Sequence, residues 1–210
     1  MPDQSLPIVP PAGAPPAFPV RLVRPGQVRF AQDLEEARRS LVAMVALPAT
    51  APWGIDLETT GLDPLVDRVR LVQLAHPAGP VLVIDAFAVP SWAELLTSRL
   101  AGTSLVAHHA QFEARFLLAA GFAPSALHCT ALLYRAALSR PRPIGDCAGK
   151  GWRGGMVSLA QAAREILQVD LDKTEQLADW SSPVLTAAQV AYAADDAVAT
   201  MRLAQALLPL

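Results

Sequence analysis

The sequence predicts an α/β domain in which a mixed β-sheet is flanked by helices and the C-terminal third of the chain is helical. Hydrophobic residues make up 52% of the 210 residues and charged residues 17%, as is typical of a chain with one sizeable core. Three strand-like runs follow one another closely, at WGIDLET, RVRLVQLA and PVLVID. The gaps between them leave no room for a crossover helix, so we expect this part of the sheet to be antiparallel.

The start of the chain is rich in proline. The first 25 residues hold eight of the nineteen prolines, which removes backbone donors and favours extended chain. We therefore expect a flexible tail at residues 1–18 and one folded domain at residues 19–210. A short strand is expected at FPVRLV. The following AQDLEEARRSLVAMVA has helical spacing, and its predicted buried stripe consists of Leu34, Ala37, Leu41 and Val42.

After the third strand the apolar period becomes helical. SWAELLTSRLAG and QFEARFLLAAG are predicted helices, separated by a short buried strand at SLVAHH, and Gly121 ends the second helix. From residue 125 onward the chain is predicted to be nearly all helical apart from a basic loop. Two capping boxes mark helix starts in this part, pairing Ser158 with Gln161 and Thr186 with Gln189.

Charge is distributed unevenly. The net charge of −2 excludes a protein whose whole surface attracts nucleic acid. Residues 135–153 differ, because five basic side chains there face a single acid, Asp146. This segment is either a binding surface for an anionic polymer or a solvated loop with incidental charge. Its basic residues are Arg135, Arg140, Arg142, Lys150 and Arg153.

Targeting and metal signals are few. No apolar stretch reaches about 18 residues and no secretory leader is visible, so we expect a cytoplasmic protein without membrane contact. Cys129 is expected to be a buried structural residue and His76 a turn residue. A zinc site that joins His108 and His109 to His128 or Cys129 is a weaker alternative, because the spacing fits no usual zinc pattern. Nothing identifies a protein partner.

Acidic residues occur in three separate segments. In WGIDLET the two-residue period of a strand puts Asp56 and Glu58 on one face, opposite the apolar side chains. Glu113 lies early in the helix that follows the buried strand. Taken alone, the strand pair would favour an edge strand with a solvent-facing acidic face.

The last helix carries the third acidic segment. Tyr192 and Asp196 are four residues apart and so share one helical face, which could also be a tyrosine packed under a surface acid. Asp195 is turned away from them, and we expect it to face solvent or to form a local hydrogen bond.

In their order along the chain, these segments resemble the DEDD (DnaQ-like) 3′–5′ exonuclease superfamily, in the subgroup whose third motif is Tyr-x-x-x-Asp. The three motifs are IDLETTGLD, AHHAQFEARFL and YAADDA. The final third, from SLAQAAREILQ to AVATMRL, is similar to the ribonuclease D catalytic domain and to the proofreading domain of family-A DNA polymerases. The resemblance implies a ribonuclease H-like fold. It also implies a metal-dependent exonuclease that hydrolyses single-stranded DNA or RNA from the 3′ end and releases 5′-mononucleotides.

The resemblance further implies residue roles. Two Mg²⁺ or Mn²⁺ ions would be held by four carboxylates, because hard divalent cations prefer carboxylate oxygens; these are Asp56, Glu58, Glu113 and Asp196. The Tyr192 hydroxyl would orient the attacking water. Leu62 would pack against the terminal nucleotide. The other candidate substrate-binding residues are Thr59, His109, Phe112, Arg142, Lys150 and Arg153.

The second motif departs from the family pattern. Glu113 stands where aspartate is usual, and His109 where asparagine is common. Glutamate keeps the charge but adds a methylene, so metal geometry or metal preference would change. An alternative function is therefore a catalytically weakened nucleic-acid-binding or adaptor module with the same fold. The other motif residues, Asp56, Glu58, Tyr192 and Asp196, favour the enzyme.

Overall fold

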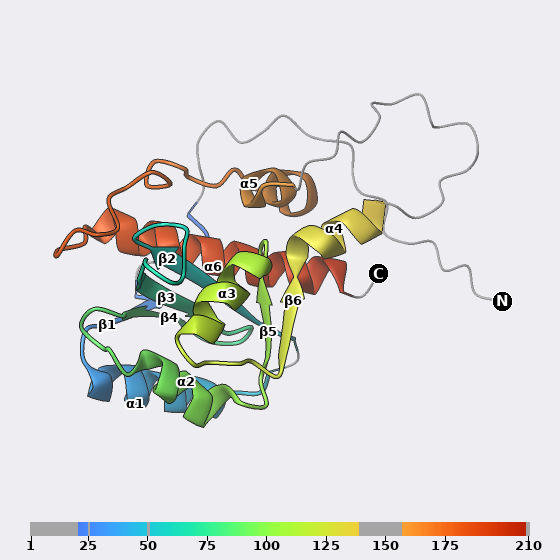
Figure 1. The fold of residues 1–210 in the computed structure, drawn as a ribbon. Helices are drawn as coiled ribbons and strands as arrows, with labels where there is room; N and C mark the ends of the chain where they lie inside the picture. The colour runs from blue at the N-terminus through green and yellow to red at the C-terminus, as the bar shows by residue number, and fades with distance from the viewer. Residues whose placement is uncertain (1–20, 25, 50, 139–156, 209–210) are drawn as a thin grey trace, which may run out of the picture.

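In a computed structural model, the chain forms an α/β domain around one mixed six-stranded sheet (Figure 1). The structure describes residues 21–24, 26–49, 51–138 and 157–208, so the predicted tail and most of the basic segment lie outside the described residues. The strand order is β1-β4-β3-β2-β5-β6. The strands are β1 (Val28–Ala31), β2 (Trp53–Thr59), β3 (Val69–Ala75), β4 (Val81–Asp85), β5 (Ser104–Ala107) and β6 (Ala126–Cys129).

Strand direction follows the lengths of the connections. β2, β3 and β4 pair antiparallel, which confirms the prediction from their short gaps. The outer pairs are parallel: β1 with β4, β5 with β2, and β6 with β5. The acid-bearing β2 is therefore an interior strand of the sheet rather than an edge.

Helices cover both faces of the sheet (Figure 1). Helices α1 and α2 pack together on one face, and the long α6 crosses the other. The helices are α1 (Leu34–Val45), α2 (Trp92–Leu100), α3 (Gln111–Ala119), α4 (Thr130–Leu138), α5 (Leu159–Ala162) with its π-helical continuation Ala163–Leu167, and α6 (Ala187–Leu207). In the described residues, no helix has both the length and the apolar character needed to cross a membrane.

Helix α6 begins at the capping box that the sequence predicts. The Thr186 side chain accepts from Gln189 N–H, and the Gln189 side chain accepts from Thr186 N–H. Only one of the two contacts of the second predicted capping box forms. Ser158 accepts from Gln161 N–H at the start of α5, but the Gln161 side chain donates to Glu165 instead.

Gly54 in β2 sets the distance between the sheet and α6. A Cβ at this position would lie 2.3 Å from the Ala197 carbonyl oxygen and 3.0 Å from the Met201 Cβ. Only glycine therefore allows the strand and the helix to approach this closely. The approach matters because Asp56 lies two residues further along β2 and Asp196 directly precedes Ala197.

Three local predictions were wrong. No strand forms in the described part of FPVRLV; the first strand is β1, further along the chain. The part after residue 125 is not nearly all helical, because β6 extends the sheet before α4 begins. In α1 the buried stripe consists of Ala37, Leu41 and Met44, whereas Leu34 and Val42 are exposed.

Candidate active site

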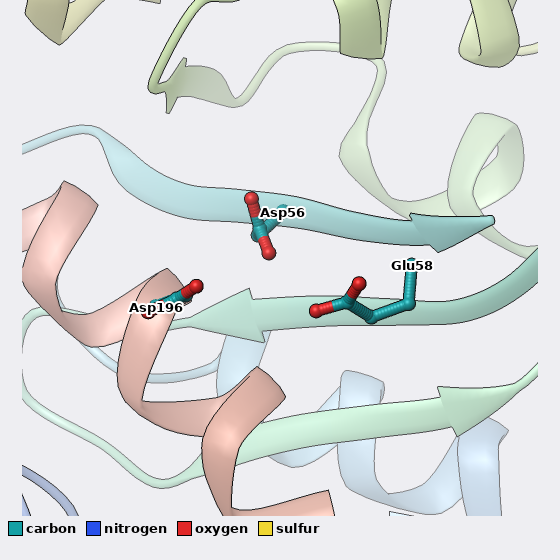
Figure 2. Close-up of side chains that lie close together, drawn as sticks. All are labelled: Asp56, Glu58 and Asp196. Carbon is teal, nitrogen blue, oxygen red and sulfur yellow. The ribbon is translucent and has the colours of Figure 1, made fainter. Parts of the chain in front are cut away.

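Three carboxylates meet between β2 and α6 (Figure 2). One oxygen from each of Asp56, Glu58 and Asp196 lies within 4.8 Å of the other two. The two-residue period of β2 turns Asp56 and Glu58 away from the core that holds Ile55 and Leu57. Asp196 reaches toward them from the middle of α6. In the described part of the chain, this is the only such group of three or more potential metal ligands.

The clustered carboxylates resist ionisation. Burial raises the pKa of Asp56 well above its usual value, and the charges of Glu58, Asp196 and Glu113 raise it further. The pKa of Glu58 is raised well above its usual value for the same reasons. Burial raises the pKa of Asp196 to about 7, although the hydrogen bond from Tyr192 lowers it. A divalent cation would relieve both the desolvation and the repulsion, so these residues suit Mg²⁺ or Mn²⁺.

Glu113 lies at the rim of this group. It is buried at the first turn of α3, and its Oε2 atom has no hydrogen-bond partner. Burial raises the pKa of Glu113 to about 8. Glu113 is outside the set of three, yet its charge acts on both Asp56 and Glu58. A buried carboxylate oxygen without a partner, facing a cluster of acids, is consistent with an additional cation ligand.

Tyr192 is buried against Trp180, one helical turn before Asp196. Burial raises the pKa of Tyr192 above its usual range, and the negative charges of Asp196 and Glu58 raise it further. The hydroxyl therefore stays protonated, and it lines the same cavity as Asp196. A neutral phenol in this position can orient a water molecule, but it cannot act as a general base near neutral pH.

The adjacent histidines connect the start of α3 to the C-terminal part of the chain. The Nε2 atoms of His108 and His109 lie 2.8 and 2.9 Å from the Val157 carbonyl oxygen. His108 Nδ1 lies 2.8 Å from the Thr130 hydroxyl. Because a carbonyl only accepts, both Nε2 atoms must donate. Burial lowers the pKa of His108 to about 4, so this histidine is neutral.

These contacts leave no zinc site in the described residues. The nitrogens of His108 bond to Thr130 and Val157, and His128 Nε2 lies 3.0 Å from the Ser104 hydroxyl. Cys129 is only partly buried, although it packs against the core, so the prediction of a buried residue was wrong. His76 lies in a turn as predicted, where its Nδ1 accepts from Ala78 N–H.

The predicted substrate-binding residues that the structure describes fall into two groups. Leu62 is 77% exposed beyond the end of β2, where it is free to meet a ligand, and the Thr59 hydroxyl donates to Gly61 O just before it. Phe112 and His109 line an open hollow of about 760 Å³ alongside α3 and β6. Arg142, Lys150 and Arg153 lie outside the described residues.

Asp195 does not face solvent. It is buried, and its Oδ1 accepts from Leu22 N–H and Val23 N–H at 2.9 and 2.8 Å. Its Oδ2 accepts from Arg21 at 3.2 Å. Asp195 thus satisfies the backbone donors of residues 22 and 23 with a side chain, which explains why no strand forms there. This bond spans more than 170 positions, so the prediction of a local partner was wrong as well.

Comparison with known proteins assigns this chain to a family. A family model described as 3′–5′ exonuclease matches residues 28–210. This chain therefore belongs to the 3′–5′ exonuclease family, a class of phosphodiester hydrolases. Over 145 residues it is 30% identical to DNA polymerase I of Aquifex aeolicus (strain VF5). That alignment covers 69% of this chain and 21% of the polymerase, so the chain spans about a fifth of this relative.

Solved structures agree with this assignment. NrnC of Brucella melitensis matches with a TM-score of 0.62 and 27% identity over 87% of this chain and 78% of NrnC. The Nibbler EXO domain of Aedes aegypti matches with a TM-score of 0.69 and 19% identity over 92% of each chain. Further NrnC structures, with bound Mg²⁺ and bound to pGG, match at 24% and 22% identity. The ribonuclease H-like exonuclease fold predicted from the sequence is thereby confirmed.

Proposed function

We propose that this chain removes 5′-mononucleotides one at a time from the 3′ end of single-stranded DNA or RNA, with two divalent metal ions. The observation that carries the proposal is the group formed by Asp56, Glu58 and Asp196, whose oxygens approach within 4.8 Å in a domain of the exonuclease family. The NrnC structures with Mg²⁺ and pGG support the choice of Mg²⁺ and of a nucleic-acid substrate.

The reaction is the hydrolysis of one phosphodiester bond. The oxygen of a water molecule attacks the terminal phosphorus, the bond from phosphorus to the 3′ oxygen breaks, and a proton ends on the leaving 3′ oxygen. When bound, divalent ions supply Lewis-acid activation of the water and offset part of the charge that develops on the phosphate. We propose that Asp56, Glu58, Glu113 and Asp196 hold these ions.

The remaining residues position the reactants. The protonated hydroxyl of Tyr192 shares a cavity with Asp196 and can accept a hydrogen bond from the attacking water. We propose that Leu62, with Thr59 behind it, packs against the last nucleotide, and that His109 and Phe112 border the path of the strand. Because the terminal nucleotide must reach the carboxylates, a duplex end should resist hydrolysis unless it frays.

The basic segment is proposed to bind the strand backbone. Its residues Arg142, Lys150 and Arg153 would each neutralise a phosphate and release counterions. Arg142→Ala and Arg153→Ala should then each reduce the slope of log affinity against log salt concentration by about 0.7 for a single strand. If both slopes equal the wild-type slope, the binding surface lies elsewhere.

The proposal is tested with matched DNA and RNA oligonucleotides labelled at the 5′ end. In Mg²⁺ or Mn²⁺ we expect a ladder of stepwise shortened products, and we expect EDTA to abolish it. A 3′-terminal label should be released first as a mononucleotide. The absence of any EDTA-sensitive shortening on both DNA and RNA would refute the enzyme, whereas internal cuts would refute its 3′ polarity.

A further inference from the structure

One cationic side chain lines a small cavity beside the carboxylates. Lys173 is exposed on the segment between the π-helical turn and α6. A cavity of about 110 Å³ is lined by Lys173 together with Gln176, Leu171, Tyr192 and Asp196, among others. This cavity therefore joins an ammonium group to the tyrosine and to one carboxylate of the candidate metal site.

The charge of Lys173 acts on the carboxylate site. It lowers the pKa of Asp196, in opposition to the burial that raises it. Among the described residues, no arginine or lysine forms a salt bridge to any of the four carboxylates of the site. Lys173 is thus near enough to interact with the site but forms no salt bridge to its carboxylates.

The segment that carries Lys173 is held in place by its neighbour. Asp172 Oδ2 lies 3.2 Å from Arg21 Nη2, and the same guanidinium bonds through Nη1 to Asp195 on α6. Asp172 also accepts from Thr174 N–H at 2.9 Å. Arg21 therefore fastens this segment to the helix that bears Asp196, while the Lys173 ammonium makes no salt bridge in the described structure.

We propose that Lys173 binds a phosphate oxygen of the terminal phosphodiester and stabilises the charge that develops there during hydrolysis. The inference rests on the proposed exonuclease function. Four ionised carboxylates and two divalent cations cancel in charge, so the phosphodiester and its additional negative charge in the transition state remain to be offset. An ammonium group offers three donors and a full positive charge for this purpose.

The rate of the first cleavage under single-turnover conditions in Mg²⁺ tests the proposal in the chain of residues 1–210. Lys173→Met should lower this rate about 10- to 100-fold, the loss expected for one charge-assisted hydrogen bond to the transition state. Lys173→Arg should recover most of the activity. Arg99→Met, which removes an exposed cation from α2 on the opposite face of the sheet, is the matched control and should leave the rate unchanged.

A second measurement separates contact with phosphate from a structural role. Binding is compared in Ca²⁺ for two oligonucleotides whose 3′-terminal linkage is either a phosphodiester or an uncharged methylphosphonate. Lys173→Met should weaken binding of the diester about 10-fold and leave binding of the methylphosphonate unchanged. Equal weakening of both, or a wild-type cleavage rate in Lys173→Met, would overturn the role of Lys173. A wild-type chain without metal-dependent shortening would instead overturn the proposed function.

Discussion

Gly54→Ala should separate β2, which carries Asp56, from α6, which carries Asp196. The added Cβ would meet the Ala197 carbonyl oxygen at 2.3 Å, whereas ordinary contact begins at 3.4 Å. The backbone of α6 must therefore retreat by about 1 Å, because neither contacting group is the flexible end of a side chain. Asp196 directly precedes Ala197, so it moves with the helix and away from Asp56.

The displacement should affect both stability and activity. Overpacking of a core contact of this kind costs about 1–3 kcal/mol of unfolding free energy. A shift of about 1 Å in a reacting group can lower a rate about 100-fold. After a loss of about 1–3 kcal/mol, most molecules would still be folded at 25 °C. We therefore expect Gly54→Ala to reduce activity by far more than the small unfolded fraction can explain.

Urea unfolding and the rate of 3′ shortening measure the two effects. Gly102→Ala is the matched control, because a Cβ at Gly102 meets nothing within 4 Å and the change should be close to neutral. Wild-type stability together with wild-type rate in Gly54→Ala would refute the view that this glycine sets the spacing of the carboxylates.

Two further predictions concern stability. In EDTA, the unfolding free energy should fall as the pH rises from about 5 to about 8. Folding raises the pKa of Glu113 to about 8 and that of Asp196 to about 7. The folded chain therefore binds more protons than the unfolded chain over this range, and a rise in pH removes them. Urea titrations at several pH values check this, and a stability that increases with pH would contradict it. Asp195→Ala should lower the unfolding free energy by about 1–3 kcal/mol, because the buried N–H group of Leu22 and the partly buried N–H group of Val23 lose their acceptor. An unchanged urea midpoint would show that this contact contributes nothing.

Local periodicity predicted most of the elements around the site. The alternation in WGIDLET correctly separated Asp56 from its apolar neighbours, because the period of a strand is fixed by backbone geometry. The capping residues likewise located the start of α6 at Thr186, since the cap is a contact over three residues. These features depend only on neighbours in sequence, which is why the sequence alone reveals them.

Contacts between distant segments could not be predicted in this way. Asp195 appears on the polar side of its helix by periodicity, but its partners lie in the segment at residues 21–23. Arg70 is another example, since it occupies an interior strand and is buried in an ion pair with Asp85. In both cases a charged residue looks solvent-facing until the fold brings its partner to it.

The role of Gly54 was not predicted from the sequence, although its position within a strand indicates one. A glycine inside a strand often marks the close approach of another backbone. The identity of the approaching segment, at Ala197, depends on the packing of α6 across the sheet and is available only from the structure. The same holds for Lys173, whose relation to Tyr192 appears only when the cavity between them is seen.

We propose that the carboxylate group of β2 and α6 is the metal-dependent catalytic site. Comparison of Asp56→Asn with wild type in a Mg²⁺-dependent assay of 3′ shortening tests it most directly, with Glu94→Gln on the exposed side of α2 as the control. We predict that Asp56→Asn folds and loses activity by about 100-fold or more, while Glu94→Gln retains the wild-type rate. A folded Asp56→Asn chain that shortens the strand at the wild-type rate would contradict the claim.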